Sequence, residues 1–152
     1  MALDTTDLSI LNKLQANAQL TTKEIAAAVN LSVTPVHDRI RKLERAGYIE
    51  RYVALLNRKK LGKSLVVYCN VTLDKQRKES FEEFNAAVSR LPEVLECSVV
   101  SGSFDYLLKV IANDVEAYNA FYQQNLSVLQ SVLHISSFFV MSEVKSTTEI
   151  PI

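Results

Sequence analysis

The stretch from Thr21 to Gly47 constrains the fold more than any other part of the chain. Its first four residues, TTKE, form a capping-box pattern, in which the Thr21 hydroxyl accepts from the backbone N–H of Glu24 and the Glu24 carboxylate reaches back to Thr21. This pattern predicts the start of a short helix. The helix would bury three apolar side chains, those of Ile25, Ala26 and Val29. Asn30 and Leu31 then form a tight turn, because asparagine tolerates left-handed backbone geometry.

A second helix is expected directly after this turn. Ser32 can cap it, Pro35 falls in its first turn, where a missing N–H costs nothing, and Gly47 ends it. Apolar residues at the spacing i, i+4 and i+7 give this helix one buried face, formed by Val36, Ile40 and Leu43. The polar and basic side chains are therefore turned outward.

Another helix is predicted upstream, over the segment DLSILNKLQANAQ, residues 7–19. Its apolar side chains recur at helical spacing: Leu8, Leu11, Leu14 and Ala18. Three helices with a tight turn between the last two, and a basic outer face on the last, are typical of a helix-turn-helix DNA-binding unit. In such units the second helix of the pair enters the major groove and places its N-terminal residues on base edges.

The outward face of the last helix predicts the DNA contacts. Side chains early in this helix are expected to meet bases: Thr34, His37, Asp38 and Arg41. Cations later in the helix or beyond it are expected to neutralise phosphates: Lys42, Arg45, Arg51, Arg58, Lys59 and Lys60. The alternative is a helix face that is only solvated. Arg39 lies near the buried stripe, and the sequence leaves open whether it forms an intramolecular ion pair or a phosphate contact.

The charge distribution agrees with a DNA-binding first part. Residues 1–63 carry 11 Lys and Arg against 6 Asp and Glu, whereas residues 64–152 carry 6 against 11, so a formally neutral chain has a basic first part and an acidic second part. This asymmetry is expected if only the first part touches a polyanion. Chance clustering of solvated charge would give the same totals.

Composition suggests three segments. We predict a helix-turn-helix DNA-binding domain over residues 1–50 and a short strand with a basic, glycine-containing linker over residues 51–64. The remaining segment, residues 65–152, is predicted to be a second packed domain.

In this last segment, strand and helix patterns follow one another in the order βαββαβ. The strands are expected at LVVYCNVTL (65–73), VLECSVVS (94–101), YLLKVIA (106–112) and ISSFFVMSEV (135–144). Asp74 and Asp114 can cap the two helices, and Pro92 stops the first. This order predicts an α+β fold of the ferredoxin-like type, with an antiparallel sheet and both helices on one face.

Both alternating sets of strand residues contain apolar side chains. Val66 and Tyr68 belong to one set, and Val67 and Cys69 to the other. Because the helices cover only one face, the second apolar face needs another cover. We therefore expect a homodimer in which two sheets pack together. Such a dimer would also present two recognition helices to half-sites about one helical turn, roughly 34 Å, apart or a multiple of it.

The sequence also resembles a known family. The string LSVTPVHDRIRKLERAGYI, residues 31–49, preceded by LDTTDLSILNKLQANAQLTTKEIAAAVN, residues 3–30, closely resembles the winged-helix DNA-binding half of the Lrp/AsnC family of bacterial and archaeal transcription regulators. The resemblance covers the whole chain. It implies a winged helix-turn-helix domain joined by a short strand to an α+β ligand-binding and assembly domain. It further implies sequence-specific binding to double-stranded DNA, modulated by an amino acid or related small molecule, and dimers that assemble as far as an octamer.

The effector site is predicted through this resemblance. From the residues alone, VSGSFDYL is a hairpin turn in which Gly102 takes positive φ and the Asp105 carboxylate caps the turn. In members of the family, this hairpin and the start of the last strand form an amino-acid pocket near the contacts between dimers. The matching positions are Gly102, Ser103, Asp105, Ser136 and Ser137. Backbone N–H groups of a glycine turn can hold an α-carboxylate, and an acidic side chain can pair with an α-ammonium. The chain departs from the common family pattern at Ser103 and Phe104, where Asp and Tyr are usual, which leaves the identity of the ligand open.

Two other functions remain as alternatives. The resemblance also extends to sirohaem decarboxylases, which are enzymes with a similar fold. Here, however, the only histidines are His37 and His134, and no cluster of Cys, Asp or Glu suggests a metal site or an acid–base pair. We expect no enzyme, no catalytic residue, no metal and no cofactor other than an amino-acid effector. The other alternative, an architectural protein that wraps or bridges DNA without an effector, needs the same basic helix and assembly surface, so the sequence does not separate it.

The ends and hydropathy of the chain bear on its location. The N-terminus MALDTTDLSI lacks a charged region followed by a long apolar run, and no stretch approaches the roughly 18 uninterrupted apolar residues that a membrane span needs. We expect a cytoplasmic protein with no membrane association.

Overall fold

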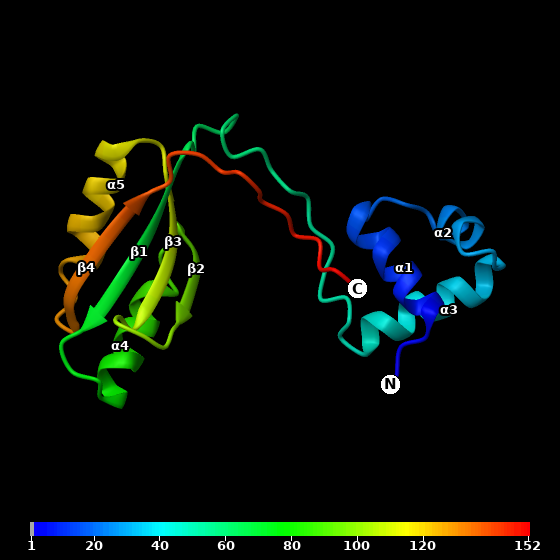
Figure 1. Cartoon of the computed structure of the whole chain (residues 1–152), viewed down its shortest axis with the longest axis horizontal. Coiled ribbons are helices and arrows are strands. Elements are labelled where there is room, and N and C mark those ends of the chain that lie inside the picture. The colour runs from blue at the N-terminus through cyan, green and yellow to red at the C-terminus, as the bar shows by residue number, and fades with distance from the viewer. Residues whose placement is uncertain (1) are drawn as a thin grey trace. The chain divides into compact units, whose positions relative to one another are not determined.

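The structure is a computed structural model that describes residues 2–152, and these form two compact units (Figure 1). The first unit contains the residues up to Leu55 together with Lys145–Ile152, and the second spans Leu56–Val144. The sequence placed residues 65–152 in one domain. In the structure, the last eight of these residues pack with the first unit instead.

Three helices make up the first unit: α1 (Thr5–Ala16), α2 (Thr22–Ala28) and α3 (Val33–Arg45). The predicted capping box begins α2, because Glu24 N donates to Thr21 Oγ1 over 3.2 Å and Thr21 N donates to Glu24 Oε2 over 2.7 Å. A second capping box, formed by Asp4 and Asp7, begins α1.

The tight turn between α2 and α3 forms as predicted. Asn30 takes a left-handed φ of 56°, and Leu31 N donates to Ala26 O over 3.0 Å. This bond satisfies a carbonyl of the last helical turn and is the signature of a Schellman motif. Ser32 occupies the N-cap position of α3, but its side chain makes no capping hydrogen bond, so that part of the prediction is wrong.

The core of the first unit is formed by one face of each helix. Its buried side chains are Ile10, Leu14, Ile25, Ala26, Val36 and Leu43. The stripe predicted for α1 is therefore only partly correct, because Ile10 lies outside it and is fully buried, whereas Leu8 and Leu11 are half-buried. Leu11 packs against the edge of this core, and Leu8 is not among the side chains that contact it.

The short strand predicted at the start of residues 51–64 does not form. Residues 51–56 have an irregular backbone and pair with none of the four strands of the described chain. The predicted basic turn follows, with Gly62 at a φ of 75°.

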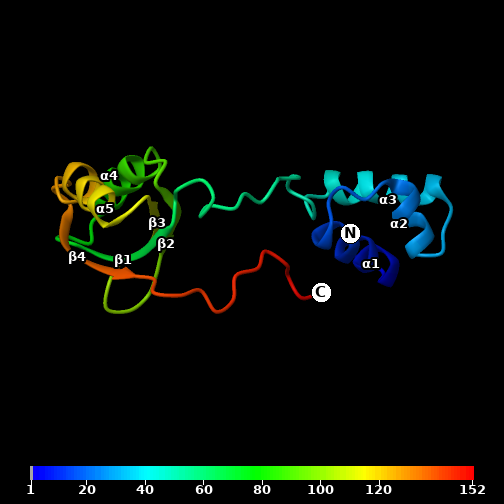
Figure 2. The same ribbon diagram turned by 90° about the horizontal axis from the view of Figure 1, so that it is seen from above.

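The second unit has the predicted βαββαβ order. Its elements are β1 (Leu65–Leu73), α4 (Lys78–Val88), β2 (Val94–Val99), β3 (Tyr106–Ala112), α5 (Val115–Phe121), a π-helical turn (Tyr122–Leu126) and β4 (Val132–Phe139). All strand pairs are antiparallel, and the strand order is β2-β3-β1-β4. Figure 2 shows α4 and α5 on the same face of the sheet.

Alternation along the strands decides which side chains lie beneath these helices. Val67, Cys69 and Val71 of β1 are fully buried there, together with Phe84 of α4 and Tyr106 of β3, whose ring centroids are 4.4 Å apart. The other set of strand residues faces away from the helices, and we call this side the open face of the sheet.

The two predicted helix caps have different outcomes. Asp114 caps α5 as expected, because its Oδ1 accepts from Ala117 N over 2.8 Å. Asp74 does not cap α4, which begins four residues later at Lys78 with Arg77 as its N-cap. A carboxylate can cap only the two or three residues that follow it, and the chain turns before the helix begins.

Candidate nucleic-acid interface and effector site

Helix α3 presents an outward face with the six of its own residues that were predicted to contact DNA. These residues are exposed: Thr34, His37, Asp38, Arg41, Lys42 and Arg45. On the opposite side of the same helix, Val36 and Leu43 are fully buried against α1 and α2. The packing therefore fixes which side of α3 is offered to a partner.

The cations on this face are not neutralised by acidic side chains of the same chain. Among residues 2–152, the ion pairs within α3 and its surroundings involve Arg39 and the neighbours His37 and Asp38, and none includes Arg41, Lys42 or Arg45. The Arg45 Nε donates only to the backbone oxygen of Arg41, over 3.3 Å. Their charge is available for a phosphate or a base edge.

Arg39 resolves the alternative that the sequence left open. Its Nη1 lies 2.7 Å from Asp4 Oδ2 and 2.6 Å from Asp7 Oδ1, so it forms an intramolecular ion pair. The Asp7 backbone N–H and this guanidinium both hold the pKa of the Asp4 carboxyl below its ordinary value. Arg39 thus joins α3 to the capping box of α1 and is not part of the outward basic face.

Two further contacts hold the segment that follows α3. The Tyr52 hydroxyl donates to Glu44 Oε1 over 3.0 Å, and burial, followed by this carboxylate, raises the pKa of Tyr52 to about 12. Arg58 was predicted to neutralise a phosphate. In the structure its guanidinium donates to the carbonyls of Lys63 and Ser64 and pairs with Glu143, so it is engaged within the second unit.

The hairpin predicted to bind an effector lies between β2 and β3. Gly102 has a φ of 145°, and both Gly102 and Ser103 are exposed. Asp105 is buried, and its two carboxylate oxygens accept from Leu73 N over 2.8 Å and from Gln76 Nε2 over 2.9 Å. Asp105 therefore ties the hairpin to the end of β1.

The two serines of β4 lie on opposite faces of the sheet. Ser136 pairs with Asn70 on the open face, and its Oγ lies 3.0 Å from His134 Nε2. Ser137 pairs with Cys69 on the helix-covered face and shares a hydrogen bond with the Tyr118 hydroxyl. Because β1 lies between β3 and β4, the hairpin and Ser136 flank the C-terminal end of β1.

Gln76 and Tyr118 are the residues around this site that the sequence did not indicate. Gln76 lies in the loop after β1 and has no pattern that singles it out. Tyr118 was expected as an apolar face residue of its helix, but its hydroxyl also lies 3.1 Å from Cys69 Sγ, and burial raises its pKa.

Comparison with known families decides the affiliation. The winged helix-turn-helix DNA-binding family matches residues 3–50, and the Lrp/AsnC ligand binding domain family matches residues 66–150. The chain belongs to the Lrp/AsnC family. Leucine-responsive regulatory proteins from Salmonella typhimurium and from Escherichia coli share 43% and 42% identity with it over 150 residues, which cover 99% of this chain and 92% of each relative.

Solved structures of Lrp/AsnC regulators have the same fold along the whole chain. A transcriptional regulator from Neisseria meningitidis, solved as an L-Met complex, has a TM-score of 0.95 at 37% identity, covering 99% of this chain and 97% of that one. An AsnC family regulator from Agrobacterium tumefaciens has a TM-score of 0.93 at 38% identity, covering 98% and 97%. AsnC from Escherichia coli, at 22% identity and a TM-score of 0.92, shares the fold.

These comparisons confirm the predicted family, the α+β fold class and the function of a transcription regulator with a DNA-binding and a ligand-binding domain. The Lrp/AsnC relatives are regulators and not enzymes, which sets aside the decarboxylase alternative. Along residues 2–152, none of the helices combines the length and the apolar character that crossing a membrane requires.

Proposed function

We propose that the outward face of α3 reads operator DNA in this regulator. The base-reading residues are Thr34, His37, Asp38 and Arg41, and the phosphate-contacting residues are Lys42 and Arg45. One observation carries the proposal: these side chains are exposed on one side of a helix whose other side is fixed by buried Val36 and Leu43. Unpaired cations on a rigid face suit both kinds of contact.

The test compares two neighbouring cations on selected and random DNA. Arg41→Ala should mainly reduce the preference for a duplex selected from a random-sequence pool, because a base contact is lost. Lys42→Ala should weaken binding to both duplexes alike and reduce the slope of the salt dependence by about one. Arg90→Ala, which removes an exposed arginine of the second unit, is the control. Equal losses on both duplexes for Arg41→Ala would contradict its base-reading role.

The effector is an amino acid that binds at the hairpin end of the second unit. Backbone N–H groups at Gly102 and Ser103 and the Ser136 hydroxyl are placed to bind it, while Asp105 and Ser137 hold the hairpin and β4 in position. The L-Met complex of the Neisseria meningitidis regulator, at 37% identity, supports an amino-acid ligand. A neighbouring dimer would complete the pocket around these exposed groups.

Calorimetric titration with each common amino acid tests this site. We expect one amino acid, or a small related group, to bind the wild-type protein and to lose affinity in Ser136→Val. The matched control is Ser89→Val, because Ser89 is an exposed serine at the C-terminal end of α4, on the helix-covered side of the sheet. Unchanged affinity in Ser136→Val would remove Ser136 from the site.

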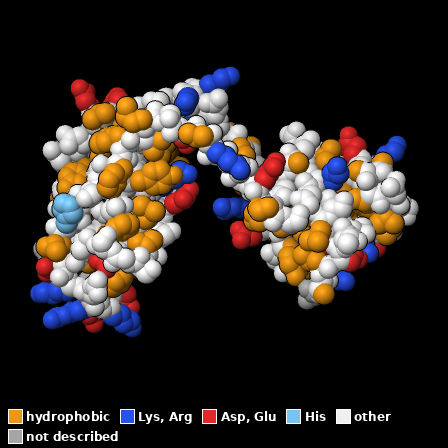
Figure 3. All heavy atoms as spheres, viewed as in Figure 1, with side chains coloured by type: hydrophobic (Ala, Val, Ile, Leu, Met, Phe, Trp, Pro, Cys, Tyr) orange, Lys and Arg blue, Asp and Glu red, His pale blue; other side chains and the backbone are white. Residues whose placement is uncertain are grey.

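The open face of the sheet supports a homodimer, and we propose in addition that dimers assemble further, as far as an octamer, and that the protein acts in the cytoplasm. The apolar side chains that remain at least partly exposed on this face are Tyr68, Leu107, Ile111 and Phe138. Tyr68 is 36% exposed and Phe138 is 54% exposed, although the two residues are paired on the neighbouring strands β1 and β4. Figure 3 shows apolar side chains gathered over the strands of the second unit. A second copy of the sheet would remove this surface from water.

A further inference from the structure

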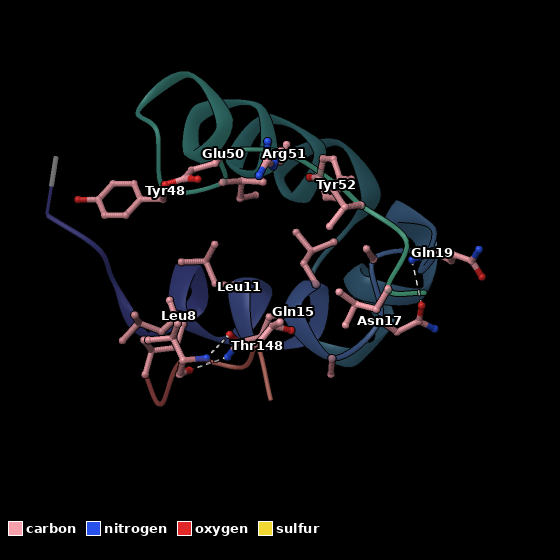
Figure 4. A pocket seen from close by; sticks show the side chains of 18 of the residues that line it. Leu8, Leu11, Gln15, Asn17, Gln19, Tyr48, Glu50, Arg51, Tyr52 and Thr148 are labelled. Carbon is pink, nitrogen blue, oxygen red and sulfur yellow. Dashed lines mark hydrogen bonds between the residues drawn. The ribbon is translucent and has the colours of Figure 1, made fainter. Parts of the chain in front are cut away.

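The last eight residues pack within the first unit, although they directly follow the second unit in sequence. We call the segment Lys145–Ile152 the C-terminal strap. It lies along α1, and Figure 4 shows Gln15 of this helix directed at the strap beside Thr148. The family match to the ligand-binding domain includes all but the last two of these residues, so neither the sequence nor the family suggests that they contact a DNA-binding helix.

Specific hydrogen bonds join the strap to α1. The Gln15 side-chain amide donates to Ile150 O over 2.8 Å and accepts from Ile150 N over 2.9 Å, so it pairs with this residue as a neighbouring strand would. Asn12 Nδ2 donates to Ile152 O over 3.1 Å, and its own Oδ1 accepts from Gln15. The hydrogen bond between the Asn12 and Gln15 side chains therefore orients both amides toward the strap backbone.

Apolar contact accompanies these bonds. A groove of about 940 Å³ lies between α1, residues 48–55 and the strap. Its lining includes the half-buried Leu8 and Leu11 of α1, and the strap contributes Ile150 and Ile152. The strap thus covers part of an apolar surface that α2 and α3 leave exposed.

The other end of the strap is also held. The chain passes from the first unit to the second after Leu55 and returns after Val144. Within the second unit, Arg58 and Glu143 form an ion pair that joins the entering and the leaving segment. The returning segment is therefore held at both ends: the strap bonds to α1 within the first unit, and Glu143 pairs with Arg58 within the second.

We propose that the strap is a second tether of the DNA-binding unit, with Gln15 as its anchor. A unit held by two chain segments has less orientational freedom than one held by a single linker, so less of that freedom is lost when paired units bind two half-sites. The strap thereby raises affinity for DNA with two half-sites and leaves affinity for one half-site unchanged. This inference depends on the DNA binding proposed for α3.

The first test measures hydrogen exchange of the strap in the full-length protein. In wild type the Ile150 amide is expected to be protected, because Gln15 accepts its hydrogen. In Gln15→Ala it should exchange at the rate of an unstructured peptide. Gln19→Ala is the control, since the hydrogen bond of Gln19 in the described chain runs from its backbone N to Asn17 Oδ1 and does not involve the strap. Equal, fast exchange of Ile150 in wild type and Gln15→Ala would overturn the docking of the strap.

The second test measures DNA affinity of the same three proteins. The probes are a two-half-site duplex selected by the wild-type protein from a random pool and a duplex that carries one of its half-sites. Gln15→Ala should bind the two-half-site duplex roughly tenfold more weakly and the single half-site equally well. Equal affinity of Gln15→Ala and wild type for the two-half-site duplex, with the strap shown to be released, would overturn the tether. Failure of wild type to select any duplex would overturn the DNA-binding proposal as well, and the exchange result would still show whether Gln15 anchors the strap.

Discussion

At the scale of single residues, Arg39 and Lys42 are both cations of α3 with opposite expected roles. Arg39 pairs with Asp4 and with buried Asp7, whereas Lys42 has no acidic partner in the described chain. We predict that Arg39→Ala lowers the free energy of unfolding by about 1 kcal/mol, because the Asp7 carboxylate loses a charged partner, without changing DNA affinity. Urea unfolding and DNA titration measure the two effects. Weaker DNA binding by folded Arg39→Ala would contradict this assignment.

The capping carboxylates give the first unit a pH dependence. Backbone N–H donors lower the pKa of Asp4, with a further contribution from Arg39, and lower the pKa of Glu24 at the start of α2. Because these pKa values are lower in the folded chain, the stabilisation is present above the unfolded values of 3.8 and 4.5 and is lost as pH falls through the folded ones. We predict that the stability of the first unit declines as pH falls below about 4, measured by thermal unfolding followed by circular dichroism. Asp4→Asn should show a smaller acid dependence than wild type, and an unchanged one would contradict this cause.

Local chemistry explains which of these residues the sequence could identify. The Thr21 and Glu24 capping box and the left-handed Asn30 depend on neighbours within a few positions, so their roles are readable from the sequence. The partners of Arg39 and Asp105 are about 30 positions away. Only the packed fold brings such groups together, which is why Arg39 remained undecided and the anchoring role of Asp105 was missed.

At the scale of helices and strands, periodicity succeeded where one face of an element is buried. The strands at residues 65–73 and 106–112 were predicted to the residue, because both are continuous runs rich in β-branched and aromatic side chains bounded by polar or glycine-containing turns. It was only partly correct for α1, because Leu8, Leu11 and Leu14 follow helical spacing, yet Ile10, outside that stripe, is the fully buried residue. The strand expected at the start of residues 51–64 failed for a different reason, since strand formation requires a partner that sequence pattern does not reveal.

The two aspartates proposed as helix caps provide a matched prediction. Asp114→Ala should destabilise the second unit by about 1 kcal/mol, because Ala117 N loses the carboxylate that caps α5. Asp74→Ala is the control, since α4 begins four residues beyond Asp74. Thermal unfolding of both variants measures the difference. Equal destabilisation by the two substitutions would mean that Asp74 has a role that its position does not explain.

At the scale of the whole molecule, the open face of the sheet predicts the oligomeric state. A double variant, Tyr68→Asp with Phe138→Asp, should dissociate the proposed dimer, because two carboxylates would have to be buried between sheets. Val128→Asp places a carboxylate at another exposed apolar position, outside the sheet, and should leave assembly intact. Sedimentation equilibrium gives the masses, and circular dichroism checks that each variant is folded. A double variant with the wild-type mass would show that the dimer uses another surface.

The central claim is that an amino acid alters DNA binding by this Lrp/AsnC regulator. The most direct measurement titrates labelled DNA from upstream of its own gene with the purified protein, against random DNA of equal length, with and without a pool of the common amino acids. We predict tight, salt-sensitive binding that prefers the upstream DNA and shifts with the pool, since coupled sites must affect each other's affinity. Selective binding that ignores the pool would contradict effector control and favour an architectural role. Equal binding to both DNAs, or none, would contradict sequence-specific recognition by α3.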